Sequence, residues 1–206
     1  MYKDILSKEQ HDILPLIGEF SKDFYLVGGT AIALQLGHRH SIDFDLFTEK
    51  KIKRKQIINV IRKNGFIPDK IIYEAYDQMH LIIKGVKVTF FQYEHEIKAS
   101  LNFENIINIP PLPDLAAMKA YALGGRAKWK DYVDLYFIIK NNFSYKEISN
   151  RAVELFQTFF NPKLFKEQLS YFDDIDYSEE VVYLPGQDVS EEEIKRFLID
   201  VATEEF

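Results

Sequence analysis

The chain contains no cysteine, a single tryptophan and no stretch of eighteen consecutive apolar residues. The lack of cysteine excludes a disulfide framework, thiol catalysis and a zinc site built on thiolates. The lack of a long apolar stretch predicts that no helix crosses a membrane. The first residues also lack a basic segment followed by an apolar one, as a secretory signal would require. We therefore expect a cytoplasmic protein without a membrane partner.

Positive charge is also scarce, since 26 lysines and arginines stand against 32 acidic residues and give a formal net charge of −6. This balance argues against a surface that holds nucleic acid by charge alone, because such binding depends on neutralising phosphates. The densest cationic run is residues 50–55, with the sequence KKIKRK. Two interpretations of this run stay open: the solvated start of a helix, or a contact for an RNA acceptor.

What the sequence does contain is a glycine pair followed by two aspartates at a characteristic spacing. An apolar strand is predicted at Phe24–Val27, Gly28 and Gly29 follow it, and Asp43 and Asp45 come next, between large apolar residues. Residues two apart on a strand point to the same face, so these carboxylates would lie about 7 Å apart and converge on one cation. Glycines let backbone N–H groups approach phosphate closely. The pattern therefore predicts a nucleotidyl-transfer site with Mg²⁺ on the two aspartates.

Each half of this pattern has a simpler interpretation. A glycine pair after a strand is often only a turn, and an Asp-x-Asp pair is often loop or cap chemistry. The pair lacks the downstream residues of a calcium loop. Thr30 is expected to cap the helix that follows the glycines and, with Gly28 and Gly29, to seat the phosphates of the nucleotide. His38 and His40 leave open a His/Asp metal site of the phosphohydrolase kind.

On these residues the chain resembles the AbiEii/AbiGii-type nucleotidyltransferases, which belong to the DNA polymerase β-like superfamily. The resemblance is carried by Val27–Thr30 and Asp43–Leu46, and by a lead of the form Arg-x-Ser at Arg39 and Ser41. A distal block supports it independently, with Asp-hydrophobic-Ala-x-x-Lys and Arg-x-x-x-Lys-Asp-x-x-Asp-Leu-Tyr patterns at residues 114–119 and 126–136. The similarity extends over about residues 20–175.

The resemblance implies a nucleoside triphosphate substrate, Mg²⁺ and a toxin of a bacterial toxin–antitoxin or abortive-infection system, with a cognate antitoxin as partner. It also implies that Arg39 and Ser41 belong to the nucleotide-binding site. The expected reaction moves a nucleoside monophosphate to an acceptor hydroxyl. The acceptor stays open between tRNA or another RNA, a protein side chain and a small molecule, and the resemblance to toxins favours the first two.

The chain departs from the superfamily pattern at the third acid. The expected position is in residues 86–91, where Thr89 stands instead of a carboxylate. A hydroxyl is a poor general base. Three interpretations stay open: slow transfer without this acid, its replacement by Glu74 or Glu94, or a catalytically silent nucleotide-binding or interaction module that kept the fold.

A triphosphate carries more negative charge than one Mg²⁺ neutralises, so further cations are expected around it. The candidates in the distal block are Lys119, Arg126 and Lys130. Lys119 and Arg126 are seven residues apart and would share a helix face if Gly124–Gly125 bends the chain only mildly. The adjacent acids Asp131 and Asp134 would lie side by side, either orienting Lys130 or Arg126 by salt bridge or standing near the acceptor.

The predicted fold class is α+β: a polymerase β-like mixed sheet with helices, followed by a mainly helical C-terminal part. Three prolines within residues 110–113 mark the boundary, because they interrupt both helices and central strands. The expected domains are a nucleotidyltransferase core at residues 1–109 and a helical region at 114–206. Asp114 is expected to cap the first helix of the second region.

Overall fold

The computed structural model describes residues 1–204 and divides the chain into two compact units, Met1–Pro111 and Leu112–Phe206. The first unit contains a five-stranded sheet and the second is helical, so the predicted α+β fold with a mixed sheet is confirmed. Over residues 1–204, no helix is both long and apolar enough to cross a membrane.

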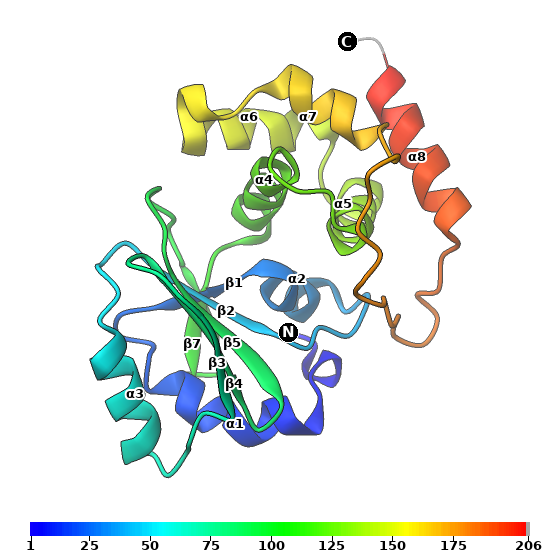
Figure 1. Ribbon diagram of the computed structural model, residues 1–206. Helices are drawn as coiled ribbons and strands as arrows, with labels where there is room; N and C mark the ends of the chain where they lie inside the picture. The colour runs from blue at the N-terminus through cyan, green and yellow to red at the C-terminus, as the bar shows by residue number, and fades with distance from the viewer. Residues whose placement is uncertain (205–206) are drawn as a thin grey trace. The chain divides into compact units, whose positions relative to one another are not determined.

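The sheet of the N-terminal unit has the strand order β1-β2-β5-β4-β3 (Figure 1). Its strands are β1 (Tyr25–Val27), β2 (Phe44–Thr48), β3 (Lys70–Glu74), β4 (Gln78–Ile83) and β5 (Val86–Gln92). Strand β2 pairs antiparallel with β1 and parallel with β5, and the β3-β4-β5 meander is antiparallel. A separate hairpin is formed by β6 (Leu101–Phe103) and β7 (Ile107–Ile109), two short strands that the sequence did not predict.

Strand β2 alternates between a buried and a half-buried face, which separates the core from the candidate site. Phe44, Leu46 and Thr48 are buried, whereas Asp45 and Phe47 are half-buried on the opposite face. Strand β4 alternates in the same way, whereas β5 buries Val88, Thr89 and Phe90 in succession, so Thr89 is buried on the face that carries Asp45. The 3-10 helix η1 (Lys3–Ile5) and helices α1 (Lys8–Gly18), α2 (Gly28–Leu36) and α3 (Arg54–Lys63) complete this unit (Figure 1).

Helix starts and stops follow local chemistry at most ends. A capping box is present at the start of α1, because Ser7 and Gln10 exchange side-chain and backbone hydrogen bonds. Helix α3 ends just before Gly65, which has a φ of +80°. A capping pair such as Ser7 and Gln10 satisfies N–H groups that the start of a helix would otherwise leave unpaired.

Two predicted caps are wrong. Helix α2 begins at Gly28, so Thr30 lies inside its first turn, where it is buried and hydrogen-bonded elsewhere. Helix α4 begins at Leu112 rather than after Asp114, and Asp114 lies in its first turn. A proline near a helix start sacrifices no intrahelical hydrogen bond, which explains why Pro113 is tolerated there. The Asp114 carboxylate pairs with Arg151 at 2.7 Å instead of capping.

The C-terminal unit consists of helices with an aromatic core. Helix α4 (Leu112–Leu123) ends before the Gly124–Gly125 break, and α5 (Trp129–Asn141) resumes after it. They are followed by α6 (Tyr145–Phe156), the 3-10 helix η2 (Gln157–Phe159), α7 (Pro162–Leu169) and α8 (Glu191–Thr203). Half-buried Tyr121 stacks on the buried ring of Phe156, with centroids 4.4 Å apart.

Candidate active site

The glycine pair lies directly beside the second aspartate. The register pairs Val27 of β1 with Asp45 of β2, so Gly28 immediately follows the residue opposite Asp45. Gly28 has a φ of +72°, and a Cβ placed on it would strike Oδ2 of Asp45. Only glycine allows both this backbone conformation and this approach. Backbone N–H groups at the start of α2 are therefore held next to a carboxylate.

Buried side chains behind the glycines fix the segment that leads into β2. Arg39 is only 1% exposed, and a Cβ on Gly29 would lie 2.5 Å from its Nη2. The Thr30 hydroxyl forms hydrogen bonds with Ser41 Oγ, at 2.9 Å, and with the main-chain carbonyl of Asp43. These contacts hold the chain just before the acidic pair, so Arg39, Ser41 and Thr30 position it from within.

The two aspartates provide a compact set of oxygen donors. Asp43 lies immediately before β2 rather than on it, and both carboxylates are half-buried. Lys87 on β5 lies with its Nζ 3.8 Å from Oδ2 of Asp43. Residues 1–204 contain no group of three or more histidine and acidic side chains that could hold a metal by itself. Two carboxylates suit Mg²⁺, which takes its other ligands from water and substrate phosphates.

A row of side chains crosses the face of the sheet that carries Asp45. Thr89 of β5 is paired with Asp45 of β2, and His80 of β4 is paired with Thr89. Thr89 is thus next to the acid on the adjacent strand, and His80 is one strand farther. The ring Nε2 of His80 lies 2.8 Å from Oε1 of Gln78. Burial lowers the pKa of His80, Lys87 lowers it further, and Asp45 acts in the opposite direction.

Neither glutamate suggested as a replacement acid lies on this row. Glu74 is paired with Met79, a core-facing residue of β4, and therefore lies on the opposite side of the sheet from His80. Glu94 is exposed beyond the end of β5, five residues after Thr89. In an extended chain that separation is about 16 Å. The replacement of the third acid by Glu74 or Glu94 is not supported by this geometry.

The two histidines before the acidic pair do not form a metal site. His38 is 1% exposed, and Nδ1 of His40 lies 3.1 Å from the main-chain oxygen of Ile5. Neither belongs to a cluster of metal-ligand side chains within residues 1–204. The phosphohydrolase alternative therefore has no support in the N-terminal unit.

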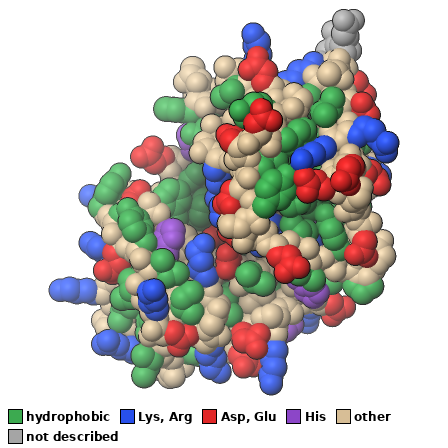
Figure 2. Space-filling model, turned by 45° about the vertical axis from the view of Figure 1, so that its right-hand side comes forward, with side chains coloured by type: hydrophobic (Ala, Val, Ile, Leu, Met, Phe, Trp, Pro, Cys, Tyr) green, Lys and Arg blue, Asp and Glu red, His purple; other side chains and the backbone are tan. Residues whose placement is uncertain are grey.

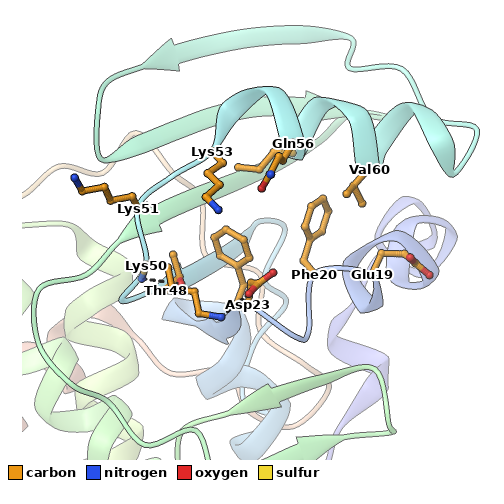
Figure 3. Close-up of a pocket in the computed structure, with 11 residues that line it drawn as sticks. Glu19, Phe20, Asp23, Thr48, Lys50, Lys51, Lys53, Gln56 and Val60 are labelled. Atoms are coloured by element: carbon orange, nitrogen blue, oxygen red, sulfur yellow. Dashed lines mark hydrogen bonds and ion pairs between the residues drawn. The ribbon is translucent and has the colours of Figure 1, made fainter.

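The cationic run borders a cavity of about 290 Å³ on the core-facing side of β2, between α3 and the turn after α1 (Figure 3). Phe20, Phe24, Ile57 and Val60 supply apolar lining, and Lys53 projects over the cavity while Lys51 points away from it (Figure 3). Its other lining residues are Glu19, Asp23, Thr48, Lys50 and Gln56.

The cations of this run differ in their pairing. Lys50 pairs with Asp23 at 2.5 Å, whereas Lys51, Arg54 and Lys55 form no ion pair with the described part of the chain. Elsewhere positive and negative side chains are interspersed on the visible face (Figure 2). The run is therefore a local concentration of uncompensated positive charge.

In the C-terminal unit, the predicted phosphate-binding cations are held by acids. Lys119 of α4 lies between two carboxylates of α5, with its Nζ 2.6 Å from Asp131 and 3.0 Å from Asp134. The Nε of Arg126 lies 3.1 Å from Asp131. Lys119 is 5% exposed at its side chain, whereas Arg126 is 53% exposed and lines a 550 Å³ cleft of this unit. Asp131 therefore pairs with Arg126, as one of the two expected roles requires, whereas the contacts of both acids with Lys119 were not expected.

Lys130 is engaged by a different carboxylate. Its Nζ lies 3.1 Å from Glu179 Oε2, and Lys128 lies 2.5 Å from Oε1 of the same residue. Burial alone would raise the pKa of Glu179, but hydrogen bonds from the two lysines outweigh it and lower the pKa to about 2. Glu179 thus remains ionised at neutral pH and compensates both cations.

His80 is a residue of this row that sequence reasoning does not single out. The available signal was its position in an alternating strand, which placed it on a polar face. Its proximity to Asp45 depends on the register of three strands, and no local pattern specifies that register.

Comparisons with known proteins identify the family of this chain and its fold. The family model described as "Nucleotidyl transferase AbiEii toxin, Type IV TA system" matches residues 16–77 and 85–205. The uncharacterised protein aq_aa25 of Aquifex aeolicus (strain VF5) is 31% identical over 176 residues, which cover 82% of this chain and 84% of that protein.

Solved structures show the same fold at low sequence identity. A candidate nucleotidyltransferase from Helicobacter pylori has a TM-score of 0.64 at 18% identity, covering 98% of this chain and 94% of its own. The nucleotidyltransferase toxin MenT4 of Mycobacterium tuberculosis H37Rv has a TM-score of 0.61 at 13% identity, covering 94% and 81%.

Proposed function

Since the chain belongs to the AbiEii family of nucleotidyl transferase toxins, we propose that it transfers a nucleoside monophosphate from a nucleoside triphosphate to an acceptor hydroxyl. The observation that carries this proposal is the close approach of Gly28 to Asp45, with Asp43 two residues earlier. A phosphate chain needs donors from the backbone and a cation held by carboxylates at the same place. This corner of the sheet offers both.

The roles of the residues follow from their positions. Asp43 and Asp45 would hold Mg²⁺, which neutralises charge on the triphosphate and polarises the phosphoryl group when bound. The backbone at Gly28 and Gly29 would bind phosphate oxygens, because the start of α2 presents its free N–H groups there. Thr30 holds the backbone of Asp43 and thereby the spacing between the two parts of the site.

Cations outside this corner are also proposed to bind phosphate, with Arg126 as a stronger candidate than Lys119 or Lys130. Arg126 is more than half exposed and can bind an anion without leaving Asp131, because a guanidinium has five donors. Lys119 and Lys130 stay predictions as nucleotide ligands, and each already has a carboxylate partner.

An RNA is the acceptor that the charge pattern favours. The unpaired cations Lys51, Arg54 and Lys55 would contact its phosphates, since an acidic protein needs a local patch for such binding. Phe20 and Phe24 line the adjoining cavity with aromatic surface. A cognate antitoxin is expected as the biological partner, as the family description indicates.

A second candidate function is a nucleotide-binding module without catalysis. The specific observation in its favour is Thr89, which stands beside Asp45 where a third carboxylate is expected. Such a module would bind the triphosphate and release it unchanged.

Incorporation of label from α-³²P nucleoside triphosphates into cellular RNA and protein fractions tests the proposal. We expect wild-type protein to label one fraction, and Asp43→Asn with Asp45→Asn to abolish both labelling and any growth inhibition on expression. The matched control is Asp173→Asn with Asp188→Asn, two exposed acids, which should behave like wild type. Calorimetric binding of a triphosphate with no incorporation into any fraction would instead establish the silent module.

A further inference from the structure

The missing third acid leaves the proposed reaction without a group that takes the acceptor's proton. In the sheet, Thr89 occupies the strand next to Asp45, and its side chain ends one bond short of where aspartate oxygens would lie. Thr89 is 7% exposed and, as a hydroxyl, is a weak base. A base for this site must therefore reach it from a neighbouring position on the same face.

His80 is the residue that the register brings to this position. Directly opposite residues on adjacent strands share a face, and the pairs Asp45–Thr89 and Thr89–His80 place all three on one face. Two strand spacings separate the Asp45 and His80 backbones, about 10 Å. The longer side chains of Asp45 and His80 thus flank the shorter, buried side chain of Thr89 on the same face of the sheet.

The surroundings of His80 suit a neutral base with a fixed ring. Nε2–H donates to Oε1 of Gln78, which leaves Nδ1 as the nitrogen with a lone pair. Tyr73 packs edge-on against the ring, with centroids 5.6 Å apart. The charged and titratable groups around the imidazole are Lys87 on β5, Asp45 on β2 and this tyrosine on β3. Burial and Lys87 both lower the pKa of His80, so its ring is neutral at neutral pH.

We propose that His80 is the general base of the reaction and stands in for the absent third carboxylate. This inference rests on the proposed function. The acceptor oxygen forms a bond to the α-phosphorus while its proton passes to the imidazole. The bond between the α-phosphorus and the bridging oxygen breaks, and pyrophosphate leaves with that electron pair. The imidazolium then returns its proton to solvent.

The decisive experiment combines removal of the histidine with restoration of an acid. His80→Gln should lower kcat by about 10²- to 10⁴-fold, the usual contribution of a general base, with little change in KM for the triphosphate. Thr89→Asp introduced into the same variant should recover activity, because the carboxylate then occupies the usual place of the third acid. His11→Gln, an exposed histidine of α1, is the matched control and should leave kcat unchanged.

Two measurements on the protein itself complete the test. NMR titration of the His80 ring should give a pKa below the ordinary histidine value of 6.5, and calorimetry should show unchanged binding of a triphosphate with Mg²⁺ to His80→Gln. Full activity of His80→Gln, or no recovery with Thr89→Asp, would overturn the role of His80 and leave the transferase proposal intact. An inactive wild-type protein that binds nucleotide would overturn both.

Discussion

Replacing Lys119 by methionine is expected to destabilise the C-terminal unit strongly. The Lys119 ammonium lies 2.6 Å from Asp131 and 3.0 Å from Asp134, and the three side chains are 5%, 3% and 0% exposed. Methionine keeps most of the apolar volume but removes the charge between two buried carboxylates. Breaking a buried ion pair in this way costs about 3–5 kcal/mol.

The loss can be measured by urea unfolding and by thermal melting. For a chain of this size, about 2–4 °C per kcal/mol corresponds to a fall in melting temperature of about 6–20 °C. Lys163→Met is the matched control, because Lys163 is 85% exposed and its partner Glu167 is 3.8 Å away. Such an exposed pair contributes about 0–1 kcal/mol.

A second variant separates the charge effect from packing. Lys119→Met with Asp134→Asn should be more stable than Lys119→Met alone, because the amide removes a buried charge that lost its counterion. A cost below about 1 kcal/mol for Lys119→Met would refute the interpretation of the trio as a tightly coupled buried network. The expected cost also means that inactivity of a Lys119 variant does not by itself identify a phosphate ligand.

Two further predictions concern the glycine corner and the acid range of pH. Gly28→Ala should cost about 1–2 kcal/mol of stability, because the backbone of Gly28 is left-handed. It should also abolish transfer in the labelling assay, because the new Cβ strikes Asp45. The control is Gly85→Ala, where φ is +77° and nothing lies within 4 Å of the new Cβ, so this variant should be strained but active in the same assay. Since the folded pKa of Glu179 is lowered from 4.5 to about 2, its stabilisation is present above pH 4.5 and is lost as the pH falls toward 2. At pH 7, Glu179→Gln should therefore unfold at a lower urea concentration than wild type. The corresponding loss in free energy of unfolding is about 1 kcal/mol or less after solvent screening. A stability difference that persisted at pH 2 would contradict this reasoning.

Local patterns were sufficient to predict the fold class and most elements. Strand β4 shows a local alternation of buried and half-buried residues, and Ile57 and Ile61 of α3 recur at helical spacing, because one face of each element is buried. The short hairpin of β6 and β7 was missed because three residues are too few to show a period.

The caps and the site required information from distant parts of the chain. A threonine or aspartate near a helix start can be a cap or a first-turn residue. Asp114 is a first-turn residue, and there it forms an ion pair with Arg151, which lies 37 residues away in the sequence. His80 likewise reaches the row only through the pairing of β4 with β5 and of β5 with β2. The site residues Asp43, Asp45, Gly28 and Gly29 remain predictions that the proposed variants test.

The parallel pairing of β2 with β5 has a consequence for synthesis of the protein. Asp45 and Thr89 are neighbours in space although 44 positions apart along the chain. When the ribosome has synthesised only the first half of the N-terminal unit, both aspartates are therefore present but strand β5, which borders Asp45, is not. Aborted translation products that stop before Val86 are expected to be harmless to the cell that makes them.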